Sequence, residues 1–368
     1  MRAAGFVLLI LCITAFCADL SAQTDNGNEE EITVDTQFVE VPIVVTDKSG
    51  KPILNLKQNN FVIFEDGKKQ EVTDFLTTTA PFEVALLLDT SGSARSDLAL
   101  IQRAAESFIA SLRPGDRVAV ISFRSVVENN RSFAEPEILS ELTDDRVKLK
   151  TALSQVKTSN GTPYYDALLQ IAEKIFKDKP KSEFQGRRAL VALTDGVDSS
   201  SSSDFSEAAQ TFSESGIVSY FIQVNTRDFF EENLLGDCQG AMRFSGAQIR
   251  RYYKTFYSKS AGERVSDFCQ LGDFERLDIS KRLYGLADTE MNSMAKNSGG
   301  KVFPAADLSE ARSAFKKVAD EIGTKYSLGY YPSNEKRDGT YRKIKVELKN
   351  VPASTTITAR EGYTAPKN

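Results

Sequence analysis

The stretch Val84-Ala-Leu-Leu-Leu-Asp-Thr-Ser-Gly-Ser93 decides how the rest of the chain is interpreted. Its first five residues, Val84 to Leu88, are all apolar, which is the pattern of a strand buried on both faces of a parallel sheet. Asp89, Ser91 and Ser93 follow where that strand is expected to end. Open α/β sheets bind ligands at the carboxyl ends of their strands, and these oxygen-bearing side chains suit a divalent cation.

A second apolar run, 189–194, also ends in an acid, Asp195, which is followed by Gly196. Between the two runs, Ser159-Asn-Gly-Thr162 precedes a helix that we expect to open at Pro163, a residue favoured at the first helical position. Further expected strands and helices alternate along this part of the chain: strands at 118–123, 133–139 and 218–224, and helices at 98–112, 144–156 and 205–215. Such alternation predicts a parallel sheet covered by helices.

The two ends of the chain have strand patterns instead. Residues 32–80 contain alternating apolar positions and an Asp66-Gly67 hairpin turn, and residues 326–364 contain three more strand-like runs. Pro42 predicts that its own strand lies at a sheet edge, because proline cannot donate to the ladder. Neither end has enough strands to bury both faces alone. We therefore expect one small β-sandwich built from both ends, with an α/β domain at 82–324 inserted between its halves.

The first 22 residues have the features of a secretory signal peptide: Arg2, an apolar run and then small residues. Residues 23–31 are polar and acidic and are expected to be a disordered lead-in. No later segment approaches the roughly 20 apolar residues needed to span a bilayer. These features predict an exported protein, either periplasmic or extracellular.

Residues 225–288 interrupt the α/β pattern and are interpreted as an insertion. They contain Cys238 and Cys269, the two cysteines left after the signal peptide, and an exported protein is expected to join them in a disulfide. The basic and aromatic segment 250–259 is either a helix face with snorkelling side chains or a contact surface, and its location slightly favours contact. The insertion could then form a rim or lid over the expected cation.

Composition excludes several kinds of function. The 368 residues include no histidine, so catalysis by Ser-His-Asp or Cys-His groups and zinc binding by histidine are ruled out. The formal net charge of -5 argues against a nucleic acid partner, since a phosphate backbone requires a basic field.

The polar residues at the strand ends resemble the metal-ion-dependent adhesion site of von Willebrand factor type A domains. The matching residues are Asp89, Ser91, Ser93, Thr162 and Asp195. The resemblance covers 82–323 and implies a Rossmann-like parallel sheet with helices on both faces; the flanks resemble a bacterial exported family that encloses such a domain between β segments. It further implies that Ser91 and Ser93 bind the cation directly, that Thr162 binds it directly or through water, and that the two acids act mostly through water.

The resemblance implies a non-enzymatic binding protein that holds Mg²⁺, with Mn²⁺ and Ca²⁺ as alternatives. A partner protein's Asp or Glu would supply the sixth oxygen that Mg²⁺ requires. One alternative is a structural or assembly component of the cell envelope in which the type A domain is a spacer. Another is a hydrolase of the aspartic protease kind, although Ser91 interrupts the Asp-Thr-Gly triplet and Asp195-Gly-Val is no second copy. Ser91 and Ser93 also have a simpler interpretation as the turn and cap of the following helix.

Overall fold

The computed structural model describes residues 37–48, 53, 55–77, 81–91, 98–178, 184, 187–257, 267–322 and 325–367. The expected signal peptide at 1–22, the lead-in at 23–31 and the candidate ligand Ser93 lie outside these residues. From Gln37 onward the chain forms one compact unit. Among the described residues, no helix is both long and apolar enough to cross a membrane.

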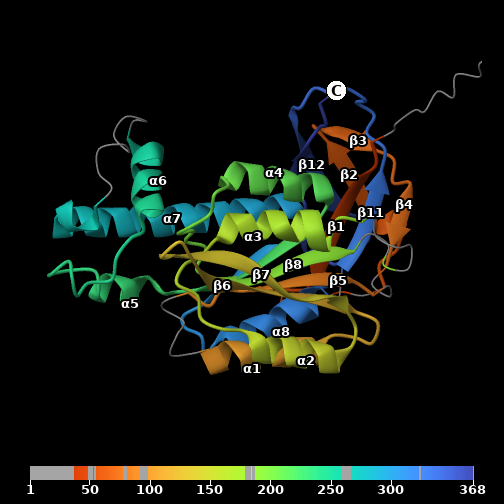
Figure 1. Cartoon of the computed structure of the whole chain (residues 1–368). Coiled ribbons are helices and arrows are strands. Elements are labelled where there is room, and N and C mark those ends of the chain that lie inside the picture. The colour runs from red at the N-terminus through yellow and green to blue at the C-terminus, as the bar shows by residue number, and fades with distance from the viewer. Residues whose placement is uncertain are drawn as a thin grey trace, which may run out of the picture. The chain divides into compact units, whose positions relative to one another are not determined.

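In the described part of the chain, a six-stranded sheet lies at the centre of the α/β domain (Figure 1). Its strand order is β10 (Lys301–Ala305), β9 (Val218–Val224), β8 (Arg188–Thr194), β5 (Glu83–Leu88), β6 (Arg117–Glu128) and β7 (Arg131–Thr143). All neighbours are parallel except β6 and β7. Every residue of β5 and of β8 is buried, as their uninterrupted apolar sequences predict.

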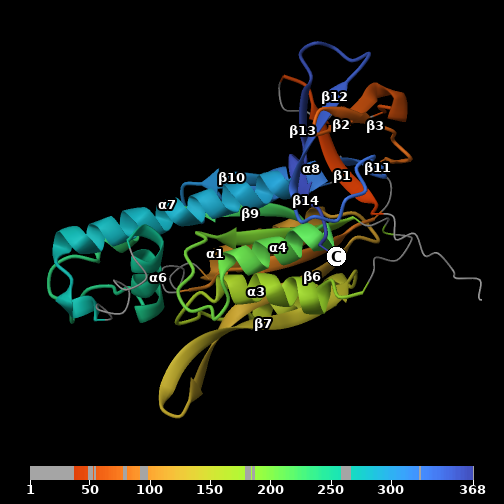
Figure 2. The same cartoon turned by 90° about the horizontal axis from the view of Figure 1, so that it is seen from above.

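The antiparallel pair β6–β7 is longer than the sequence pattern predicts. The two strands are joined at Asn129 and Asn130, which both have positive φ angles of 49° and 59°, as a two-residue hairpin turn requires. The last residue of β5, Leu88, pairs with Ser122, and β6 then continues to Glu128. The hairpin therefore extends past the carboxyl edge of the sheet (Figure 2). We call residues 123–133 the hairpin arm.

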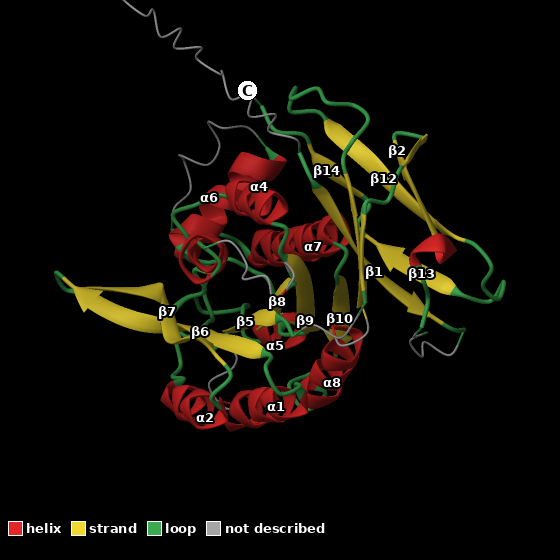
Figure 3. Ribbon diagram, turned by 90° about the vertical axis from the view of Figure 1, so that its right-hand side faces the viewer, coloured by secondary structure: helices red, strands yellow, loops and turns green. Residues whose placement is uncertain are grey.

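Helices cover both faces of the sheet (Figure 3). Along β5, Leu86 and Leu88 pack with one group of helices, and Ala85 and Leu87 pack with the other. The first group is α1 (Leu98–Ser111), α2 (Arg146–Gln155) and α8 (Ala311–Ile322). The second is α3 (Tyr164–Gln170) with the π-helical turn η3 (Ile171–Ile175), α4 (Phe205–Ser215) and part of α7 (Asp273–Ser298). The predicted fold, a mostly parallel sheet between two helical layers, is confirmed.

Two four-stranded sheets combine strands from both ends of the chain. One has the order β13 (Thr356–Ala359), β1 (Val39–Thr46), β11 (Lys325–Tyr330) and β4 (Asp74–Leu76). The other has the order β14 (Gly362–Thr364), β12 (Tyr341–Leu348), β2 (Phe61–Glu65) and β3 (Lys68–Gln70), and the short 3-10 helix η1 (Gln58–Asn60) precedes β2. Apolar residues of both sheets form one core, which makes the pair a β-sandwich.

The prediction that Pro42 marks an edge strand is wrong. Its strand, β1, lies between β11 and β13. Pro42 pairs with Ser327 of β11, but the pairing with β13 begins only at Ile43. The hydrogen-bond ladder between β1 and β13 thus starts one residue after Pro42. The N–H that proline lacks therefore removes no hydrogen bond from that ladder.

A buried polar cluster joins the two halves of the sandwich. Glu65 of β2 is 3% exposed, and one of its carboxylate oxygens accepts hydrogen bonds from the hydroxyls of Tyr330 (2.7 Å) and Tyr363 (2.9 Å). Its other oxygen lies 3.4 Å from Nη1 of Arg342, which is 1% exposed. One acid from the N-terminal half therefore satisfies three side chains from the C-terminal half.

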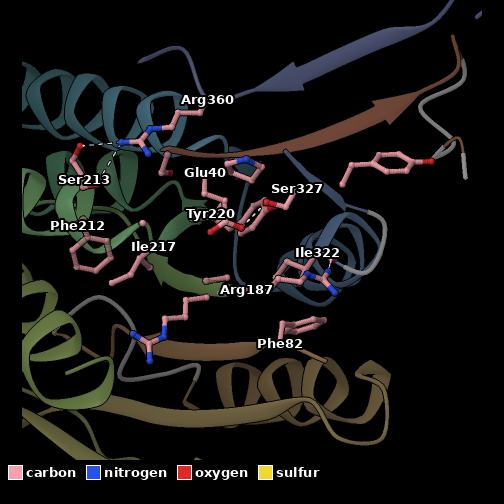
Figure 4. Close-up of a pocket in the computed structure, with 17 residues that line it drawn as sticks. Glu40, Phe82, Arg187, Phe212, Ser213, Ile217, Tyr220, Ile322, Ser327 and Arg360 are labelled. Carbon is pink, nitrogen blue, oxygen red and sulfur yellow. Dashed lines mark hydrogen bonds between the residues drawn. The ribbon is translucent and has the colours of Figure 1, made fainter. Parts of the chain in front are cut away.

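A cavity of about 60 Å³ lies where the sandwich meets the α/β domain (Figure 4). Glu40, Ser327 and Arg360 line it from the sandwich, and Phe82 and Tyr220 line it from the α/β domain. Glu40 accepts a hydrogen bond from Ser327 at 2.5 Å, and Arg360 donates to the carbonyl oxygen of Ser213 on α4 at 3.4 Å. Burial raises the pKa of Glu40 and lowers the pKa of Arg360.

The insertion has its own hydrophobic core, formed around α5 (Arg227–Glu232), α6 (Gly246–Phe256), the short 3-10 helix η5 (Phe268–Gln270) and the first half of α7. Helix α7 is one continuous helix of 26 residues that passes beyond the expected end of the insertion at residue 288. Its first half packs in the insertion and its second half packs on the sheet. The predicted disulfide between Cys238 and Cys269 is present, with 5.3 Å between the Cα atoms.

Replacing Glu65 tests the buried cluster of the sandwich. We expect Glu65→Gln to lower the free energy of unfolding by about 3–5 kcal/mol, because Arg342 would keep its buried charge without an acid to neutralise it. Urea denaturation measures this change. The exposed Glu71→Gln is the control and should change stability by less than about 0.5 kcal/mol. Equal effects of the two substitutions would show that the cluster does not stabilise the sandwich.

Candidate metal site

The two acids predicted from the strand ends lie at the same edge of the sheet. Asp89 follows β5 and Asp195 follows β8, and these strands are parallel neighbours in which Leu88 pairs with Leu193. Asp89 is buried and Asp195 is partly buried. The parallel register therefore brings together two carboxylates that are 106 positions apart in the sequence.

Each carboxylate is held through both of its oxygens. Asp89 accepts from the backbone N–H of Ser91 at 3.0 Å and from the hydroxyl of Thr194 at 2.8 Å. Asp195 accepts from the backbone N–H of Val197 at 2.9 Å and from the hydroxyl of Thr226. Both acids thus have fixed orientations before any cation is considered.

The loop that contains Thr162 is bonded to both of the other loops. The backbone N–H of Ser159 donates to the carbonyl oxygen of Thr90 at 3.0 Å. The N–H of Thr162 donates to the hydroxyl of Ser199 at 2.7 Å, and the N–H of Ser199 donates back to the carbonyl oxygen of Thr162 at 3.0 Å. Thr162 is buried. The three predicted loops therefore form one connected structure.

A small cleft of about 30 Å³ opens between the ends of the strands. Asp89, Ser91, Leu193, Thr194, Asp195, Val224, Thr226 and Leu308 line it. Three of the five predicted ligands are among these residues, whereas Thr162 lies in the adjoining loop and Ser93 is outside the described residues. Sequence reasoning missed Thr226. Thr226 could have been found from its position two residues after β9, which ends at the same edge.

The side chains at this cleft are suited to a hard cation. Only oxygen atoms are offered, from two carboxylates and several hydroxyls, which are the donors that Mg²⁺ prefers. In the described ranges no cluster of three or more His, Cys, Asp or Glu residues could hold a metal ion, so any site here depends on hydroxyls beside its two acids. We conclude that the residues present fit a divalent cation.

Electrostatics at the cleft favour a bound cation. Burial raises the pKa of the Asp89 carboxyl above its ordinary value. Burial, together with the negative charge of Asp89, raises the pKa of Asp195 to about 7. Two neighbouring acids in a poorly solvated place resist ionisation, and a divalent cation between them would remove that resistance.

The insertion takes part in the cleft, but not through its basic and aromatic segment. The hydroxyl of Thr226 lines the cleft and lies 2.9 Å from the hydroxyl of Tyr284 on α7. On α6, in contrast, Tyr252 and Tyr253 are buried in the insertion, and Arg251 donates to Glu290 at 2.7 Å. The interpretation of this segment as a contact surface is therefore wrong for Tyr252 and Tyr253. Residues 258–259 lie outside the described part.

A mostly parallel sheet between helical layers, with acids and hydroxyls in a cleft at its carboxyl edge, defines an α/β domain of the open-sheet kind. Residues 84–197 match the family model of the von Willebrand factor type A domain. The chain therefore contains a von Willebrand factor type A domain. Domains of this family are typically non-enzymatic modules for binding or adhesion, and they often hold a divalent metal at a metal-ion-dependent adhesion site.

Several solved structures are similar to this chain in fold. The conserved hypothetical protein BatB from Bacteroides thetaiotaomicron is 19% identical, with a TM-score of 0.40, over 66% of this chain and 97% of that one. A von Willebrand factor type A protein from Catenulispora acidiphila is 12% identical, with a TM-score of 0.43, over 91% and 75%. Proximal thread matrix protein 1 from the mussel byssus, with a zinc-occupied adhesion motif, is 14% identical, with a TM-score of 0.41, over 70% and 49%. Comparison with curated proteins found no match.

The raised pKa of Asp195 predicts an unusual pH dependence in metal-free protein. Unfolded Asp195 loses its proton near pH 4, whereas folded Asp195 keeps it until about pH 7. Between these values the folded state binds more protons, so the free energy of unfolding should fall as the pH rises. Urea denaturation in EDTA at several pH values measures this slope, and saturating Mg²⁺ should reduce it.

Asp195→Asn should flatten this slope, because the substituted side chain does not titrate. The exposed Asp144→Asn is the matched control and should leave the slope unchanged. Parallel pH profiles for wild type and Asp195→Asn would contradict the assignment.

Proposed function

We propose that the protein is an exported, non-enzymatic binding protein that holds a divalent cation, with Mg²⁺ the expected ion, and uses it to recognise an acidic group on a partner protein. The observation that carries this proposal is the pair of oriented carboxylates, Asp89 and Asp195, in an oxygen-lined cleft at the sheet edge. Metal-site residues are Asp89, Ser91, Ser93, Thr162 and Asp195, of which Ser93 is assigned from the sequence alone.

The chemistry of these donors explains why an acidic partner would be recognised. Hydroxyl ligands are neutral, and acids that act through water neutralise a cation less than acids that bind it directly. A cation held in this way keeps part of its charge and attracts a further anionic oxygen. Mg²⁺ takes six oxygens, so one Asp or Glu of a partner can replace a bound water with a charge-assisted contact.

Export is supported by the disulfide in the insertion. Disulfides persist in oxidising compartments, and the Cys238–Cys269 bridge joins two cysteines at the distance that a disulfide needs. Together with the signal-like sequence at 1–22, this supports a periplasmic or extracellular location.

The surroundings of the cleft favour a protein partner over a small ion alone. The hairpin arm extends past the edge at which Asp89 lies, and the insertion begins at the same edge after β9 (Figure 2). Val127 on the arm is 74% exposed, and the exposed Phe133 follows on the paired strand. Asn160 joins the arm to the Thr162 loop, since its N–H donates to Ser125 at 2.9 Å. A partner seated on the cation would meet these apolar side chains.

The alternative of an envelope component with a spacer domain differs from this proposal in one measurable way. It requires partner binding through the β-sandwich, so binding would not depend on the cation. The hydrolase alternative has no support from the fold, because the helix-covered parallel sheet is unlike an all-β aspartic protease.

A display library of random peptides tests the proposal even though the natural partner is unidentified. Selection on the immobilised protein in Mg²⁺ should enrich peptides that share an Asp or Glu, and EDTA should release them. Ser91→Ala should weaken their binding about tenfold or more, as should replacing the shared peptide acid by its amide. Ser215→Ala is the control, because this exposed residue ends α4 just before β9 begins, at the opposite end of the strand from the cleft.

Val127→Asp extends this test to the hairpin arm. It should weaken peptide binding while leaving Mg²⁺ affinity, measured by calorimetry, unchanged. Peptides that bind equally well in EDTA, or equally well to Ser91→Ala, would contradict recognition through the metal and would favour the spacer alternative.

A further inference from the structure

Two side chains of the insertion form a chain of hydrogen bonds that ends on Asp195. The hydroxyl of Thr226 donates to Oδ2 of Asp195, and the hydroxyl of Tyr284 lies 2.9 Å from the same Thr226 oxygen. When Asp195 is ionised, as it would be beside a bound cation, its carboxylate can only accept, so the single hydroxyl proton of Thr226 is directed to Asp195. The Tyr284 hydroxyl must therefore be the donor to Thr226. We call Tyr284, Thr226 and Asp195 the relay.

The relay determines where one oxygen of Asp195 points. Its other oxygen, Oδ1, accepts from the N–H of Val197, which belongs to the same turn and moves with Asp195. Thr226 comes from a different segment, after β9, and so fixes the carboxylate relative to the rest of the sheet. Among the described residues of the insertion, Thr226 is also the one that lines the cleft.

The insertion's core holds Thr226 in place. Thr226 is the N-cap of α5, and its carbonyl oxygen accepts from the N–H of Phe230 at 3.0 Å. The ring of Phe230 packs against Phe244 at 5.0 Å between centroids and against Tyr284 at 6.4 Å. Thr226, through the helix that it caps, and Tyr284, through its ring, are therefore both held by the same aromatic cluster.

Helix α7 also packs against the turn that follows Asp195. Gly196 has a φ of +76°, and a Cβ at this position would lie 2.8 Å from the end of the Met291 side chain. Met291 and Tyr284 are seven residues apart on α7, which places them on the same helix face two turns apart. The same helix face therefore packs against the turn after Asp195 and supplies the outer donor of the relay.

We propose that Thr226 and Tyr284 are positioning residues of the metal site, and that through them the insertion sets the orientation of Asp195 and the affinity for the cation. This inference rests on the proposed function, because it assumes that Asp195 contacts the cation directly or through water. It gives the insertion a role in the chemistry of the cleft, beyond that of a surface appendage.

Substitutions of Thr226 and Tyr284 test this role, with Mn²⁺ alone as the probe. Affinity is read from free Mn²⁺ by electron paramagnetic resonance and from calorimetry. Thr226→Val should weaken binding about tenfold, within the range seen for residues that orient metal ligands. Thr226→Ser keeps the hydroxyl and should bind like wild type, and Tyr284→Phe should lie between. Thr151→Val on α2 and Tyr331→Phe on the sandwich are matched controls.

A melting curve in EDTA separates positioning from general stabilisation. If Thr226 merely stabilised the fold, Thr226→Val would lower the melting temperature and leave the Mn²⁺ dissociation constant unchanged. That result, or equal affinities for Thr226→Val and Thr226→Ser, would overturn the inference and leave the proposed function standing. Wild-type protein that binds no Mn²⁺ would overturn both.

Discussion

Two acids at the ends of neighbouring buried strands are the constraint on which this structure depends. β5 and β8 are fully buried and parallel, so Asp89 and Asp195 come together at the sheet edge. Burial opposes their ionisation, and the pKa of Asp195 rises to about 7. Hydrogen-bond donors fix both carboxylates, but none of those donors removes the repulsion between two negative charges. A cation would remove it, and this supports the proposal that the cleft is a metal site.

Segments far apart in the sequence are arranged around these two acids. The Thr162 loop is bonded to the loops that follow β5 and β8, and the hairpin arm is bonded to the Thr162 loop through Asn160. On the other side, α7 supports the Asp195 turn through Met291 and reaches Asp195 through the relay. The sandwich, built from both chain ends around Glu65, lies outside this arrangement and has its own buried polar cluster. The edge of the sheet is therefore a surface assembled from several independent segments.

The parts that could be predicted from the sequence are those whose signal is local. Uninterrupted apolar runs identify β5 and β8, and the residue that ends each run identifies Asp89 and Asp195. Tyr284 could not be assigned in this way, because its contact with Thr226 joins positions 58 residues apart within an irregular insertion. The hairpin arm has little burial and hence no clear alternation, and α7 serves two different cores, so neither follows a single pattern. The prediction of an edge strand from Pro42 was wrong because β13 pairs with only part of β1.

The most direct test of the central claim is a crystal structure of the protein grown with Mn²⁺, with anomalous differences measured at the manganese edge. The account predicts one strong peak in the cleft between Ser91 and Asp195, with Thr162 among the contacting residues. In the corresponding Mg²⁺ crystals, six oxygens should surround the ion at about 2.0–2.1 Å. Full-length protein that diffracts well and shows no peak in this cleft, or a peak only at other surface carboxylates, would contradict it.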